Sequence, residues 1–163
     1  MSPHCPVCDR ILSPENPLEV YRNPRAALYH MSGIDLPGYL VLAPVRHVEH
    51  AGELDDPDLS ELARVQARAV RFILGIPGVR KVYACSFGEA VPHLHIHLFP
   101  RTDSMIEDPD CLTDGTPDGP RIFDRWRRAL AVPAETDEVL SQVTRLREHF
   151  MSFQARSDPK KRR

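Results

Sequence analysis

The sequence predicts an α+β domain: an antiparallel sheet with one long helix after the second strand pair and a C-terminal helix. Residues 93–99 alternate histidine with apolar side chains, which is the two-residue period of a strand. Apolar residues between positions 56 and 74 recur with the 3.6-residue period of a helix. A short loop separates the strand predicted at 81–87 from the histidine strand, so we expect these two strands to pair antiparallel.

The elements before the long helix are short. Residues 1–17 contain four prolines and two cysteines, and we expect a loop that a bound metal orders. Strands are predicted at 18–21, 26–29 and 39–44. The third of these strands follows a Leu-Pro-Gly turn and is ended by Pro44.

Helices and a loop are predicted in the rest of the chain. Asp56 is the expected N-cap of the long helix, and Pro57 suits its first helical position. Residues 102–121 are rich in Pro, Asp, Gly and Thr, and this composition predicts a loop. A short helix at 122–130 and a C-terminal helix at 136–151 follow.

The composition is that of an ordinary globular protein, with 42% hydrophobic and 27% charged residues. At 163 residues the chain is expected to form one domain over residues 1–153. The formal net charge is −2, and residues 154–163 are strongly basic and expected to be a disordered tail. An acidic body argues against non-specific binding to nucleic acid.

Membrane insertion and secretion are not expected. No apolar run approaches the ~18–20 residues of a membrane span, and no secretory signal is visible at the N-terminus. Four cysteines are too few for a disulfide scaffold in a chain of this length. This usage favours the reducing cytoplasm.

The histidine strand is the first candidate site. Three imidazoles, from His93, His95 and His97, are expected on one face of this strand, and water-facing strand positions seldom carry three histidines. One interpretation is a metal site formed by the triplet itself. The other is nucleophilic catalysis by one imidazole, with the remaining two orienting it and binding an oxyanion. The pattern alone leaves both open.

The second candidate site is the pair Cys5 and Cys8. Their spacing is that of a zinc knuckle, which supplies half of a tetrahedral shell. A redox pair usually opens a helix after a strand, and the N-terminal position fits that poorly. Two more ligands are required, and the candidates are His4, His30, His47, His50, His93 and His149.

Taken together, these residues resemble the histidine-triad superfamily. Its signature of three histidines separated by apolar residues matches residues 93–99 at every position. Residues 37–47, a Pro-Gly turn and strand ending in a basic residue and a histidine, are similar to the family, as are residues 88–92. The resemblance covers roughly residues 5–101, and the cysteine pair is similar to that of its zinc-bearing branch.

The resemblance implies a nucleotide hydrolase acting at the α-phosphate of a nucleoside phosphoramidate or a dinucleoside polyphosphate. His95 would be the nucleophile and form a covalent nucleotidyl-histidine, which water then hydrolyses. His97 would contact the phosphate, and the backbone carbonyl of His93 would orient the His95 ring. The residues expected to contact substrate are Tyr39, Glu89, Ala90 and Val91.

The resemblance also implies one structural zinc per chain and a homodimer. The implied ligands are Cys5, Cys8, His47 and His93, with His50 as the reserve for His47. A shell of four protein ligands is closed, and is therefore structural. It would join the triplet to the N-terminal segment and fix the direction of His95.

The chain departs from the family pattern just before the triplet. Ala90 lacks a hydroxyl that could hand a proton to the leaving group, and Glu89 adds a negative charge beside an anionic substrate. His97 stands where the transferase branches have glutamine, which favours hydrolysis. The alternatives are a non-catalytic nucleotide-binding or regulatory module, a nucleotidyl transferase with a specialised acceptor, and a metal-dependent hydrolase.

The segment after residue 101 has no counterpart in the resemblance. It carries a tryptophan within a cluster of arginines: Arg125, Trp126, Arg127 and Arg128. These side chains could reach a base or a phosphate. An amphipathic helix packed on the sheet is the simpler interpretation.

Overall fold

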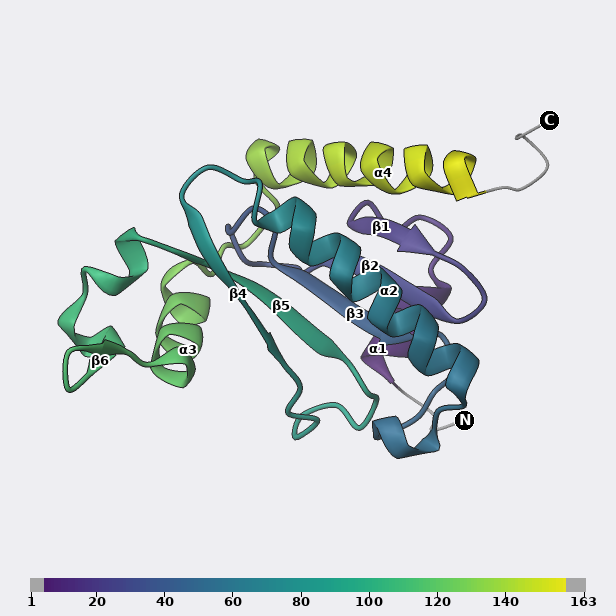
Figure 1. Cartoon of the computed structure of the whole chain (residues 1–163), viewed down its shortest axis with the longest axis horizontal. Coiled ribbons are helices and arrows are strands. Elements are labelled where there is room, and N and C mark those ends of the chain that lie inside the picture. Colours follow the sequence, from purple (N-terminus) through teal and green to yellow (C-terminus); the bar gives the residue numbers. More distant parts are fainter. Residues whose placement is uncertain (1–4, 158–163) are drawn as a thin grey trace.

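A five-stranded sheet is the centre of the fold in the computed structural model, which describes residues 5–157 (Figure 1). The strand order is β1-β2-β3-β5-β4, and all neighbours are antiparallel. The strands are β1 (Glu19–Arg22), β2 (Ala26–His30), β3 (Leu40–Pro44), β4 (Val79–Cys85) and β5 (Ile96–Thr102). The predicted α+β class is confirmed, and so is the antiparallel pairing of β4 with β5.

Four α-helices accompany the sheet in the described residues: α1 (Pro6–Leu12), α2 (Asp56–Ile73), α3 (Gly119–Ala129) and α4 (Asp137–Ser157). The long helix α2 lies where its apolar period predicts, and Pro57 stands in its first turn. Its N-cap is Asp55, not Asp56, because the Asp55 carboxylate accepts a hydrogen bond from the backbone N–H of Asp58.

The sheet buries both of its faces. Leu40 and Leu42 of β3 point toward the apolar cluster that α2 and α4 complete. Val41 and Ala43 point the other way and pack with α1. Phe99 of β5 shares this second face with residues of α3. Figure 1 shows α2 crossing the front of the sheet, with α4 running beside β1.

The N-terminal segment differs from its prediction. A loop is predicted for residues 1–17, but Pro6–Leu12 form α1. The thiol sulfur of Cys5 accepts a hydrogen bond from the backbone N–H of Cys8, and Pro6 stands in the first turn, so this segment has ordinary helix-start chemistry. Residues 1–4, including the candidate ligand His4, lie outside the described part of the chain.

The segment predicted as a loop at 102–121 contains regular structure as well. It holds two 3-10 turns, η2 (Ser104–Ile106) and η3 (Pro109–Cys111), and a small hairpin of β6 (Leu112–Thr113) and β7 (Thr116–Pro117). Helix α3 begins at Gly119, three residues before its predicted start. Met105 and Cys111 anchor the segment because both are buried with α3.

Helix α4 continues past its predicted end at 151 to Ser157, and so occupies the first residues of the tail expected at 154–163. Residues 158–163 lie outside the described residues. The single domain expected over 1–153 stays a prediction. None of the described helices combines the length and the apolar character that crossing a membrane requires.

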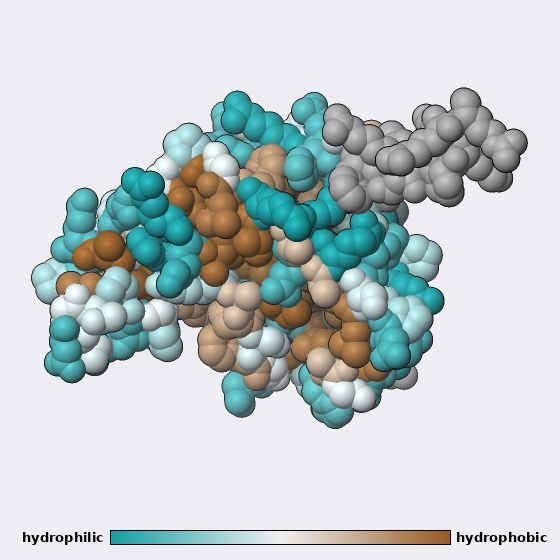
Figure 2. Space-filling model, in the orientation of Figure 1, coloured by the Kyte–Doolittle hydropathy of each residue, from teal (hydrophilic) through white to brown (hydrophobic). Residues whose placement is uncertain are grey.

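Figure 2 shows an apolar patch near the C-terminal end of α2 and the start of β4, among other apolar areas of this face. Leu74 is 47% exposed there, and Ile76 is only partly buried. The neighbouring β4 is an edge strand, so one side of its backbone has no partner strand in the described chain.

Candidate functional site

The three histidines do not all lie in a strand. β5 begins at Ile96, so His93 and His95 precede it, contrary to the prediction of a strand over 93–99. The backbone N–H of Leu94 donates to the Val48 carbonyl at 2.6 Å, which places this segment beside the chain that follows β3. The apolar alternation persists, because Leu94 packs in the cluster under α2 while His93 is buried elsewhere.

The side chain of His93 belongs to a cluster of four candidate metal ligands. Ligand atoms of Cys5, Cys8, His47 and His93 all lie within 4.8 Å of one another. Nδ1 of His93 is 3.4 Å from the sulfur of Cys5 and 3.3 Å from that of Cys8, and Nδ1 of His47 is 3.3 Å from Cys8. Helix α1, the chain after β3 and the triplet therefore converge on one point.

The donor set and its geometry fit a tetrahedral zinc. Zinc bonds of about 2.3 Å to sulfur and 2.0 Å to nitrogen place neighbouring ligand atoms about 3.6 Å apart, close to the separations seen here. Nε2 of His93 lies 3.0 Å from the Pro44 carbonyl and donates to it, which leaves the Nδ1 lone pair free for a metal. Burial and the neighbouring Cys5 raise the pKa of the Cys8 thiol to about 11, so metal binding would displace its proton.

The other histidines proposed as ligands lie elsewhere. His50 is an exposed side chain 3.6 Å from the Glu53 carboxylate. His30 is buried, and its Nε2 contacts the Leu36 carbonyl at 2.9 Å. His149 is on α4 and packs against Phe72. The reserve ligand His50 therefore takes no part in the four-residue cluster.

His95 and His97 open on a cavity of about 400 Å³, on the sheet face opposite α2. Its walls come from α1, β2, β3, the loop between β4 and β5, and α3. The residues that line it are Pro6, Val7, Tyr29, Met31, Val41, Phe87, Gly88, Glu89, Ala90, Val91, His95, His97 and Arg127. Its apolar side chains and few polar groups are typical of a small-molecule site.

His95 is held by one short backbone contact. Its Nδ1 lies 2.6 Å from the carbonyl of His93, and because a carbonyl only accepts, Nδ1 carries the proton. Nε2 of the neutral ring is then an unprotonated nitrogen. The ring stands edge-on to His97, with centroids 5.1 Å apart.

His97, which also lines the cavity, has a neutral ring near neutral pH. Burial is the main cause and, with smaller contributions from the neighbouring His95 and Arg127, lowers its pKa to about 4. The Tyr39 hydroxyl lies 3.0 Å from His97 Nδ1, and burial raises the pKa of Tyr39, so this hydroxyl keeps its proton and can donate. With Nδ1 accepting, the ring proton sits on Nε2, where it can donate to an anion.

Tyr39 was expected to touch substrate, but it does not line the cavity. It is fully buried, and its ring packs edge-on against Phe99 and Phe123. It reaches the cavity only through His97. The other three expected contact residues, Glu89, Ala90 and Val91, do line the cavity.

Much of the cavity wall was not identified from sequence. Pro6 and Val7 sit between the two cysteines, and Tyr29 and Met31 come from β2 and the residue that follows it, so no motif marked them. Alternation along β2 and β3 could have placed Tyr29 and Val41 on one face, given their antiparallel register. Arg127 was one of several arginines with no stated target, and the packing of α3 brings it to the cavity.

Comparison with known proteins identifies the fold. No protein-family model matches the chain, and no curated protein matches it. A Sulfolobus tokodaii structure described as a hypothetical histidine triad nucleotide-binding protein aligns over 95% of this chain and 97% of its own, at 19% identity and a TM-score of 0.64. A zinc-bound histidine triad family protein from Mycobacterium smegmatis aligns over 94% and 97%, at 14% identity and a TM-score of 0.61.

The C. elegans NitFhit protein, which is much longer than this chain, contains a region of similar fold. It aligns over 82% of this chain at 16% identity and a TM-score of 0.58, and the chain spans only 27% of its length. At these identities the likeness is one of fold. The resemblance expected from the triplet is confirmed at that level: the chain has the histidine-triad fold.

Proposed function

We propose that this protein is a nucleotide hydrolase that acts at the α-phosphate of a nucleoside phosphoramidate or a dinucleoside polyphosphate. The observation that carries the proposal is the 2.6 Å contact between Nδ1 of His95 and the His93 carbonyl, beside a cavity that His95 lines. It fixes the tautomer in which Nε2 has a free lone pair, as the proposed nucleophile requires. Several structural neighbours are described as histidine triad proteins, one of them as nucleotide-binding.

The proposed reaction has two displacements. Nε2 of His95 forms a bond to the α-phosphorus, and the bond from phosphorus to the leaving group breaks with its electron pair going to that group. An amine leaving group takes up a proton from water, whereas a phosphate leaves as the anion. The proton stays on Nδ1 and is donated in a hydrogen bond to the His93 carbonyl, which stabilises the positive charge of the phosphorylated ring. Water then bonds to phosphorus, the nitrogen–phosphorus bond breaks, and a nucleoside monophosphate leaves as the water proton passes to solvent.

His97 is proposed to contact the phosphate without transferring a proton. Its Nε2–H can donate to a non-bridging oxygen while Tyr39 holds the opposite nitrogen. The apolar part of the cavity, with Tyr29, Val41 and Val91, would take the nucleoside.

The cluster of Cys5, Cys8, His47 and His93 is proposed to hold one structural zinc per chain. When bound, zinc would cross-link α1 to the segment that carries His95. His93 would then act twice, as a ligand through Nδ1 and as the positioner of His95 through its carbonyl.

We also propose the homodimer and the cytoplasmic location that the sequence predicts. The edge strand β4 and the partly exposed Leu74 beside it suit a second copy of the chain. All four cysteines are free, as in reducing surroundings. Light scattering of the purified protein tests the dimer, since a monomer mass would exclude it.

The activity is tested with purified protein and a panel of nucleotides. Wild-type protein should release monophosphate, and acid quenching followed by mass spectrometry should trap a nucleotidyl-histidine. His95→Ala should lower turnover at least roughly several hundred-fold, because no other side chain can replace a covalent nucleophile. Unchanged turnover in this variant would exclude the mechanism.

A non-catalytic nucleotide-binding module is the second candidate, because two residues of the cavity lining do not favour catalysis: Ala90 has no hydroxyl to hand a proton to the leaving group, and Glu89 adds a negative charge beside an anionic substrate. It predicts tight monophosphate binding and no trapped intermediate. The metal-dependent alternative predicts that chelation abolishes activity within seconds and that added metal restores it. Transfer to an acceptor would appear as a nucleotidylated product instead of free monophosphate.

A further inference from the structure

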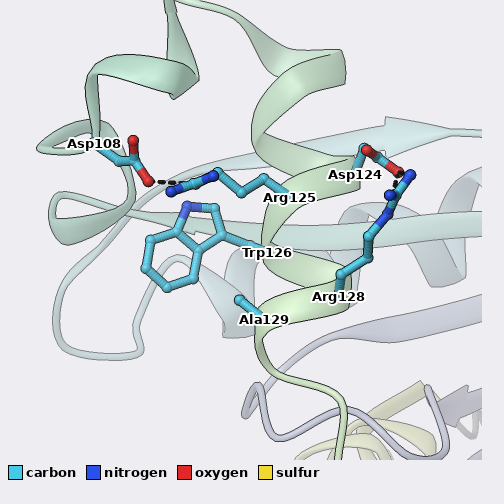
Figure 3. A pocket seen from close by; sticks show the side chains of 6 residues that line it. All are labelled: Asp108, Asp124, Arg125, Trp126, Arg128 and Ala129. Atoms are coloured by element: carbon cyan, nitrogen blue, oxygen red, sulfur yellow. Dashed lines mark hydrogen bonds and ion pairs between the residues drawn. The ribbon is translucent and has the colours of Figure 1, made fainter.

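Helix α3 directs its arginines to different sides. Figure 3 shows Arg125 pointing toward Asp108, and Arg128 paired with Asp124 of the same helix. Arg125 is also 3.3 Å from Asp110. The carboxylates of Asp108, Asp110 and Asp124 therefore neutralise the charges of these two arginines. Both arginines are thus engaged on the outer surface, away from the cavity that His95 lines.

Arg127 lies on the inner side of the same helix. Its guanidinium stands over the ring of Phe123, 5.3 Å from the centroid and one helical turn away. Its Nε is buried and, within the described residues, has no hydrogen-bond partner. It lines the cavity together with His95 and His97. A half-buried guanidinium whose Nε has no partner, beside the proposed nucleophile, suits an anion that is not part of the protein.

The cavity has little to offer a leaving group that needs a proton. An amine leaves a phosphoramidate only when protonated, whereas a terminal phosphate has a pKa of about 6 and leaves as an anion. Ala90 has no hydroxyl, and His97, with a pKa of about 4, carries no acidic proton near neutral pH. Glu89 is exposed, so solvent screens its charge more than that of the half-buried Arg127.

We propose that Arg127 is a specificity-determining residue that binds the phosphate next to the α-phosphate, and that the substrates are nucleotides with an anionic polyphosphate leaving group. This inference rests on the proposed hydrolysis. His95 Nε2 bonds to the α-phosphorus, and the bridging oxygen leaves with the electron pair of the broken bond. Arg127 neutralises the charge that develops on the departing phosphate, and no proton is transferred in this step.

The test compares two substrates in three variants of the full-length protein. Diadenosine tetraphosphate has the anionic leaving group, and adenosine phosphoramidate has the amine. Arg127→Met keeps the stem and removes the charge, and Arg127→Lys restores a positive charge. Arg128→Met is the control, since it removes an exposed arginine from the same helix.

Arg127→Met should lower kcat/KM for diadenosine tetraphosphate at least about tenfold, the scale of a lost charge-assisted hydrogen bond. Hydrolysis of the phosphoramidate should change less than about threefold, and the lysine variant should recover most of the loss. The Arg128 variant should match wild type with both substrates. An equal loss with both substrates, or no loss with either, would overturn the inference while leaving the hydrolase proposal intact.

Binding distinguishes this inference from the proposed catalysis. By calorimetry in the His95→Ala background, which prevents turnover, Arg127→Met should weaken ATP binding at least about tenfold and AMP binding less than about threefold, because only ATP has phosphates beyond the α position. Wild-type protein that hydrolyses neither substrate would overturn the hydrolase proposal. Equal effects on ATP and AMP binding would overturn the role of Arg127 in either case.

Discussion

The two ends of the histidine triplet have opposite surroundings. His93 is completely buried among two thiols and a second imidazole, and both of its ring nitrogens have partners. His95, two residues later, has one nitrogen held by backbone and lines a cavity of about 400 Å³. The same side chain is thus surrounded by metal-ligand chemistry in one case and left open to a small molecule in the other.

This difference teaches that the neighbours, more than the triplet, assign the roles. The histidines are equivalent in sequence, yet α1 closes over the first while the β4–β5 loop and α3 leave space beside the others. The link between the two ends is one residue, since His93 offers its ring to the cluster and its carbonyl to His95. Disturbing either end should therefore reveal how far the two are coupled.

The largest expected effect is on the cluster. Cys8→Ser should reduce bound zinc from one per chain to almost none, measured by elemental mass spectrometry. If free zinc stands near a thousand times its Kd, its loss removes about 4 kcal/mol of stability, or about 10 °C of melting temperature in a domain this size. Cys85→Ser is the control, because Cys85 is outside the cluster. Full zinc content in the Cys8 variant would exclude this site.

The next largest effect is the pH dependence of stability that His97 causes. An unfolded histidine has a pKa near 6.5, and that of folded His97 is about 4, so the unfolded chain binds more protons between these values. The free energy of unfolding should therefore fall as pH drops from about 6.5 to 4, by about 3 kcal/mol for this residue. Denaturant titrations of wild type and His97→Gln isolate it, because other histidines with lowered pKa, such as His149, stay in both. Parallel pH curves would contradict the prediction.

A smaller effect is expected from Tyr39, whose hydroxyl contacts His97. Tyr39→Phe removes the hydroxyl that sets the His97 tautomer, and should cost about 1 kcal/mol of stability and roughly tenfold in kcat. Zinc content should not change. Tyr83→Phe, which removes a hydroxyl from the same apolar cluster, should leave kcat within about twofold. Equal kcat values for the two variants would show that the Tyr39 contact does not position His97.

The smallest effect separates the two candidate ligands that follow β3. His50→Ala should change stability by less than about 0.5 kcal/mol, because the side chain is 72% exposed and only near Glu53. His47→Ala should lose zinc as Cys8→Ser does. Zinc loss in the His50 variant instead would reverse the assignment.

Local patterns predicted the regular elements well. The apolar period of α2, the proline in its first turn and the alternation of short strands are properties of neighbouring residues, and the structure follows them closely. Errors arose where packing overrode composition. Residues 102–121 look like a loop, yet Met105 and Cys111 bury against α3 and order two turns and a hairpin.

By itself the sequence determined the kinds of element and the chemical groups available: a strand pattern carrying imidazoles, a thiol pair, and histidines after a strand. These follow from side-chain chemistry and short-range periodicity. Only the tertiary structure decided which groups meet. It brings Cys5 and Cys8 to His93 across nearly ninety positions, buries Tyr39 behind His97, and turns Arg127 toward the cavity. Such meetings depend on how sheet faces and helices pack, and no local pattern encodes that.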